Sequence, residues 1–183
     1  VLEILGFDAT AIVAIGDINT YNPFSGAETT TSVAYEKIAT QTFTVLNTIS
    51  EAISASVINV DADAVFSYAA AELVELLEVN IAADTVINLA DSGTITTIIN
   101  ETISSVDAAK GTSVSEGLSY NSSSIIASIA TAIANTNTQI QAITFDSEAT
   151  TFDSEVLSIL NLGAEGLADQ VKTAVDAQVA VKV

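Results

Sequence analysis

Residues 123–143 read SSIIASIATAIANTNTQIQAI, and this stretch decides the fold class. A seam runs through it at alternating intervals of three and four residues, formed by Ile126, Ile129, Ile133, Thr136, Ile140 and Ile143. Such spacing is typical of the contact line between antiparallel helices in a bundle. Because many of these residues are β-branched and form helix poorly on their own, we expect burial against other helices to hold the segment.

Apolar stripes at helical spacing recur in three earlier stretches, which predict long helices over residues 32–56 and 62–90 and a shorter one that ends near Lys110. The stripes are Tyr35, Ala39, Leu46, Ile49 and Ile53, then Phe66, Ala70, Leu73, Leu77 and Ile81, then Ile95, Ile98, Ile99, Thr102 and Val106. A further helix is predicted from Ser154, with a kink or end at Gly163 and a last helix through Leu167 and Val171. The prediction is an all-α bundle of about four to six helices.

The first thirty residues are the least regular part of the chain. They contain short apolar turns at residues 2–7 and 11–15, and the pair Asn22-Pro23 marks a loop because a residue before proline is pushed out of the helical region. No Pro/Gly-rich interruption divides the 183 residues, which are enough for one well-buried core. We therefore expect a single domain, 1–183, with an irregular N-terminal segment, 1–30, and a helical bundle, 31–183.

The charge balance is strongly acidic, with 23 acidic residues, four lysines, no arginine and a formal net charge of −19. Nucleic-acid binding is excluded on this ground, because neutralising phosphates requires clustered Lys and Arg. The same charge attracts divalent cations, of which calcium is the first candidate, and no other cofactor is expected. No apolar run approaches the roughly 20 residues that cross a bilayer, so we expect no transmembrane segment.

Catalytic equipment is scarce in the sequence. Histidine and cysteine are absent, so the many Ser and Thr hydroxyls lack the usual base. A Ser-Lys dyad is the formal alternative, but all four lysines lie in stretches that we interpret as solvent-facing or terminal. We expect no catalytic residues and no enzymatic activity.

One loop has the spacing of a calcium ligand set. Residues 17–28, DINTYNPFSGAE, place oxygen donors at relative positions 1, 3 and 12 through Asp17, Asn19 and Glu28, as in an EF-hand loop. The glycine of that pattern is missing at position 6, and Pro23 stands at 7. The alternatives are a calcium site formed by Asp17, Asn19 and Glu28, and a plain capping loop.

Other carboxylates occur in pairs. Asp61 and Asp63 open the predicted second long helix, where an N-cap and a dipole-favoured carboxylate are the ordinary interpretation and a metal site is the other. The motif Phe-Asp-Ser-Glu occurs at 145–148 and again at 152–155, so that Asp146, Glu148, Asp153 and Glu155 are either helix caps or the paired carboxylates of a glycoside hydrolase. No Trp accompanies them as a sugar platform, which favours the caps.

Residues 1–58 combine a short helix-like start, VLEILG, a loop, DINTYNP, and a long helix over residues 34–53. In this they resemble a helical module of very large secreted bacterial proteins, including adhesins and calcium-binding repeat proteins related to the RTX class. Asn22 stands where Asp often precedes the proline in that module. The resemblance implies an extracellular or cell-surface, non-enzymatic segment among β-rich or calcium-binding repeats, acting as a spacer, folding unit or adhesion surface.

The resemblance implies that the partners of this chain are neighbouring domains of a larger polypeptide. The start of the chain has no basic stretch followed by an apolar one, so we expect no signal peptide here and interpret the chain as a piece of something longer or a processed product. A second hypothesis is a self-assembling subunit of an extracellular filament or surface layer, with identical subunits held by Ala, Ile and Val contacts. The third hypothesis is that the chain is an acidic glycoside hydrolase.

Overall fold

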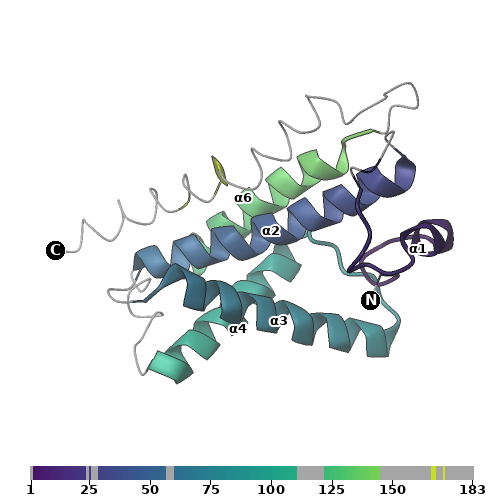
Figure 1. Ribbon diagram of the computed structural model, residues 1–183. Coiled ribbons are helices and arrows are strands. Elements are labelled where there is room, and N and C mark those ends of the chain that lie inside the picture. Colours follow the sequence, from purple (N-terminus) through teal and green to yellow (C-terminus); the bar gives the residue numbers. More distant parts are fainter. Residues whose placement is uncertain are drawn as a thin grey trace.

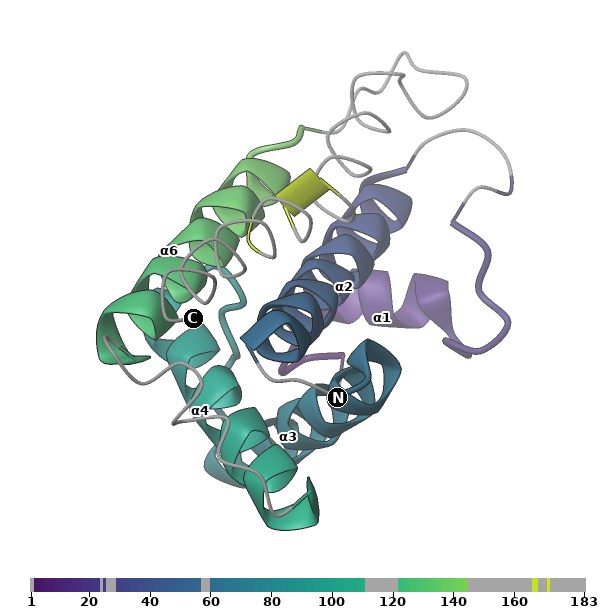
Figure 2. The ribbon, with the colours of Figure 1, turned by 90° about the vertical axis from the view of Figure 1, so that its left-hand side faces the viewer.

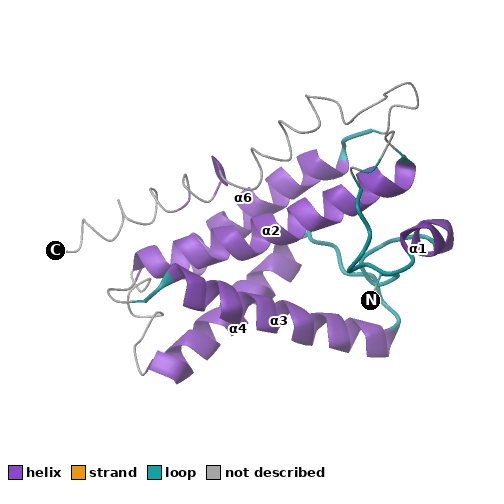
Figure 3. Ribbon diagram, in the orientation of Figure 1, coloured by secondary structure: helices purple, strands orange, loops and turns teal. Residues whose placement is uncertain are grey.

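The computed structural model describes residues 2–23, 25, 29–56, 60–110, 122–144, 166, 167 and 171. These residues form five α-helices and no strand (Figure 1) (Figure 3). The prediction of an all-α bundle is confirmed. The helices are α1 (Ala9–Ile15), α2 (Thr30–Ser56), α3 (Ala62–Ala83), α4 (Ser92–Lys110) and α6 (Ser122–Gln141).

The four long helices are arranged as a ring. α2 packs on α3 and α6, and α4 packs on the same two helices from the opposite corner (Figure 2). α2 also touches α4 across the bundle, and the short α1 packs on α2. α2 is therefore the helix around which the described elements gather.

The main core fills the centre of this ring. Its most deeply buried side chains come from all four long helices and include Ile49, Val65, Ile98 and Ile133. Burying such a side chain stabilises the fold by about 1.5–3 kcal/mol relative to leaving it exposed. On α4 every position of the predicted stripe is buried. In the stripe of α6, whose last residue, Ile143, lies just past the end of the helix, every position but the half-buried Thr136 is buried.

α3 departs from the prediction at its end. The helix stops at Ala83 instead of continuing to residue 90, because Asp84 takes the left-handed conformation at φ 54° and its amide donates back to the carbonyls of Asn80 and Ile81. Asp and Asn tolerate this conformation better than other non-glycine residues. The chain that follows α3 is held against the N-terminal segment, since the Ile87 amide donates to the Ile4 carbonyl at 2.8 Å.

α3 follows the predicted stripe only in part. Leu73 of that stripe is buried, and Phe66, Ala70 and Leu77 are half-buried against the main core, whereas Ile81 is exposed. The other buried residues, Val65 and Ala69, lie on a neighbouring stripe. Two adjacent apolar stripes run along this helix, so its periodicity predicts a helix without selecting the edge that faces the core.

The N-terminal segment is more regular than predicted, because the apolar turn at 11–15 belongs to α1. Asp8 caps this helix by accepting a hydrogen bond from the Ala11 amide at 2.7 Å, and Gly16 ends it at φ 60°. Phe7, Ala11 and Ile15 form a small buried cluster against α2. The segment is thereby packed against the start of α2.

The C-terminal part is described only in fragments. Residues 166, 167 and 171 are helical, and Leu167 and Val171 pack against the main core. The predicted helix start at Ser154 and the kink at Gly163 lie outside the described residues.

Candidate functional site

The loop predicted to bind calcium is a hydrogen-bonded turn in its described part. Asp17 Oδ1 accepts from the backbone amide of Asn19 at 3.0 Å and from its side-chain Nδ2 at 3.1 Å. The amides of Thr20 and Tyr21 both donate to the Asp17 carbonyl at 3.0 Å. The structure thus brings Asp17 and Asn19 together, while Glu28 lies outside the described residues.

In the part of the chain that the structure describes, no three His, Cys, Asp or Glu side chains gather where one metal ion could be held. The capping interpretation accounts for the contacts of Asp17 and Asn19. The calcium site that includes Glu28 stays a prediction.

Aspartates cap two further helices. Asp61 is the N-cap of α3 and accepts from the Asp63 amide at 3.2 Å. Asp91 precedes α4 and accepts from the amide and the hydroxyl of Thr94 at 2.7 and 3.1 Å, and these bonds hold the pKa of the Asp91 carboxyl below its usual value. The Asp61 interpretation is confirmed, whereas Asp146, Glu148, Asp153 and Glu155 fall outside the described residues.

One open cavity has a volume of about 530 Å³. It lies between the first turns of α2, the end of α6, the segment 86–89 and the N-terminal turn at residues 5–7. Its walls combine apolar side chains with a cation and three amides, namely Leu5, Phe7, Ile38, Lys37, Gln41, Asn88 and Gln141. We call it the Lys37 cavity.

Lys37 connects two helices at this cavity. Its Nζ donates to the backbone carbonyl of Gln141 at 3.0 Å and also to that of Ile143, so it satisfies acceptors that α6 leaves unpaired at its C-terminus. A cation there is also favoured by the helix dipole. Burial lowers the pKa of the Lys37 ammonium. The prediction that the lysines face solvent is wrong for Lys37, whose side chain is half-buried.

Gln41, which lines the cavity, belongs to a buried amide pair with Asn137. Gln41, 1% exposed, donates from Nε2 to the Asn137 carbonyl at 2.9 Å. Asn137, 0% exposed, donates from Nδ2 to the Leu89 carbonyl at 2.6 Å. These bonds join α2, α6 and the segment 86–89. The sequence signal for Asn137 is its place four residues after Ile133 and three before Ile140, which puts an amide on the buried seam.

Three buried oxygens have no hydrogen-bond partner among the described residues. They are Asn137 Oδ1 and the hydroxyls of Thr44 and Thr48 on α2. Leaving such a group buried without a partner costs about 1–3 kcal/mol. The buried hydroxyls of Thr44 and Thr48 therefore make the packing of α2 contribute less to the stability of the fold than an all-apolar face would.

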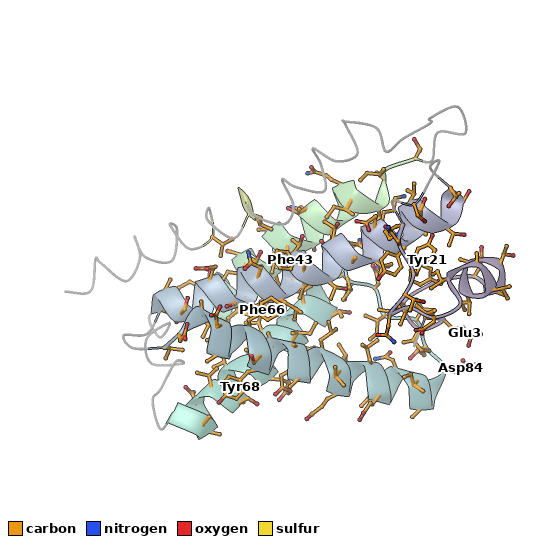
Figure 4. The ribbon with its side chains drawn as sticks, viewed as in Figure 1. Glu3, Tyr21, Phe43, Phe66, Tyr68 and Asp84 are labelled. Carbon is orange, nitrogen blue, oxygen red and sulfur yellow. The ribbon has the colours of Figure 1, made fainter. Side chains whose placement is uncertain are left out.

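A second hollow is almost entirely apolar. The apolar groove, of about 340 Å³, lies between the N-terminal segment and α2 and is lined mainly by Leu2, Leu5, Phe7, Ile18, Tyr35, Ile38 and Phe43. Ile18 and Phe43 are 42% and 43% exposed. The Phe43 ring also meets Phe66 of α3 at a centroid distance of 6.2 Å (Figure 4).

No protein-family model matches the chain, and neither a curated protein nor a solved structure is significantly similar to it. Within the described residues, no helix is both long enough and apolar enough to span a membrane.

Proposed function

We propose that this chain is a non-catalytic structural or binding module of a secreted or cell-surface bacterial protein, connected to neighbouring domains of a larger polypeptide. The observation that carries the proposal is the use of its aspartates. Asp8, Asp17, Asp61 and Asp91 each accept hydrogen bonds from amides two or three residues further along the chain. Carboxylates used in this way stabilise helix starts and turns and keep the surface acidic.

Two experiments test this proposal. Antibodies against the chain should label intact cells of its source, and external protease should remove the signal. Labelling only after the cells are lysed would contradict the assignment to the cell surface. A screen on peptide, ester, phosphoester and glycoside substrates should show no turnover, and reproducible turnover abolished by one Ser or Asp substitution, with Asp146→Ala and Asp153→Ala tested first, would contradict the non-catalytic role.

Self-assembly is the second candidate function, and the exposed side chains of the apolar groove favour it. Apolar surface at Ile18 and Phe43 offers contact to a second copy, whereas a net charge of −19 on each copy opposes that contact. Screening by salt weakens the repulsion without weakening apolar contact. Association should therefore increase with ionic strength in analytical ultracentrifugation and should be reduced by Phe43→Ser, while Val13→Ser on α1 serves as the exposed control. A monomer at every salt concentration would exclude this alternative.

A further inference from the structure

We propose that the Lys37 cavity binds a small organic carboxylate that carries an apolar body. The volume of about 530 Å³ falls in the range of small-molecule sites, which are mostly apolar with a few polar groups that orient the ligand. The cavity combines the apolar side chains of Leu5, Phe7 and Ile38 with a comparable share of polar lining, in which one ammonium lies among neutral amides. This binding activity goes beyond the proposed structural role and does not depend on where the protein is located.

The ammonium of Lys37 supplies the charge that a carboxylate requires. It carries three N–H groups, and its bonds to the carbonyls of Gln141 and Ile143 use two of them. Those two bonds also hold the side chain between α2 and the end of α6, so little side-chain entropy is lost when a ligand binds. A third hydrogen bond from Nζ can therefore be directed to a ligand oxygen.

The surrounding amides suit the second carboxylate oxygen. Gln41 is held by its bond to the Asn137 carbonyl, and the Gln141 side chain donates from Nε2 to Asn88 Oδ1 at 3.2 Å. These contacts fix amide groups at the wall of the cavity before a ligand arrives. Preorganised donors of this kind lower the cost of binding.

The charge of the site favours a monoanion over a dianion. One ammonium among neutral amides balances a single negative charge, and the net charge of −19 repels every further charge on a ligand. We therefore commit to carboxylic acids rather than to phosphate esters. Added salt should strengthen binding of the carboxylate, because it screens the repulsion from the chain more than it screens a half-buried contact.

Isothermal titration calorimetry on the full chain tests the proposal with three probes of the same shape: phenylbutyrate, phenylbutanamide and phenylbutylamine. We expect saturable binding of the carboxylate, weaker binding of the amide by about tenfold or more, and affinity for the carboxylate that rises with salt. Lys37→Met keeps the apolar stem and removes the charge, so it should weaken carboxylate binding by about tenfold or more.

Leu5→Trp is the second variant, because it fills the cavity and leaves Lys37 and its bonds to α6 in place. It should also weaken carboxylate binding, whereas Val13→Ser should leave the affinity unchanged; circular dichroism checks that each variant is folded. Equal affinity for the amide and the carboxylate, undiminished affinity in folded Lys37→Met or Leu5→Trp, or no saturable binding of any probe would each overturn the proposal.

Discussion

Gln41 of α2 and Asn137 of α6 are bonded to each other in both directions, 96 residues apart in the sequence. Gln41 Nε2 donates to the Asn137 carbonyl at 2.9 Å, and Asn137 Nδ2 lies 3.5 Å from the Gln41 carbonyl in addition to its shorter bond to Leu89. Both residues are buried. The pair therefore sets the relative position of two helices and the segment 86–89 through polar contacts inside an apolar bundle.

Removing one member of this pair should destabilise the protein. Asn137→Leu deprives the buried Leu89 carbonyl of its donor, and we expect a loss of about 1–3 kcal/mol in the free energy of unfolding, measured in urea. Asn100→Ala, on the exposed side of α4, is the control and should stay within about 0.5 kcal/mol of wild type. Equal stability of Asn137→Leu and wild type would show that the amide contributes no net stability.

Removing the unpaired hydroxyls of α2 should increase the stability of the protein. Thr44→Val and Thr48→Val each replace a buried hydroxyl by a methyl group of similar size, which removes the desolvation cost of that hydroxyl. Each should raise the free energy of unfolding by about 1 kcal/mol. Thr10→Val, at an exposed position of α1, is the control. A loss of stability in both buried variants would mean that these hydroxyls have hydrogen-bond partners in solution.

Glu36 should make stability depend on pH. Burial raises the pKa of its carboxyl above the usual 4.5, so the folded state holds this proton at pH values where the unfolded chain has released it. The stability that the protonated form contributes is complete below the unfolded pKa and is lost as pH rises through the folded pKa. Glu36→Gln should therefore raise the thermal midpoint at neutral pH and have no such effect below about pH 4.

Glu75→Gln, which removes the same charge from an exposed position of α3, controls for the general relief of repulsion. If the two variants raise the midpoint equally at neutral pH, the burial of Glu36 is not the cause.

Calcium should raise the thermal midpoint more than sodium does at matched ionic strength, because a native state with a net charge of −19 gains from any divalent ion that it binds in preference to the unfolded chain. If the site is the loop at 17–28, Asp17→Ala and Glu28→Ala should abolish the excess over sodium. An unchanged excess in both variants would place the site elsewhere, with Asp61, Asp63 or the repeated Asp146 and Asp153 next. Calcium acting no better than sodium would exclude a specific site.

The sequence by itself determined which segments form the long helices and, for α4 and α6, which face they bury. Ile95 to Val106 and Ile126 to Ile143 each carry one narrow apolar stripe, and a single stripe has only one way to be removed from water. The cap at Asp61 could also be predicted from the sequence, because an N-cap depends only on residues within one helical turn.

Only the tertiary structure decided where α3 ends, which of its apolar residues are most deeply buried, how α1 packs and what Lys37 does. The chain leaves α3 at Asp84 and bonds back to Ile4, which no local pattern indicates. Lys37 has an acceptor 104 residues away at the end of α6, so it looks like a solvated surface lysine until the two helices are packed. Periodicity reports on neighbours within a turn or two of helix, whereas these contacts depend on which distant backbone groups are left without partners once the bundle has formed.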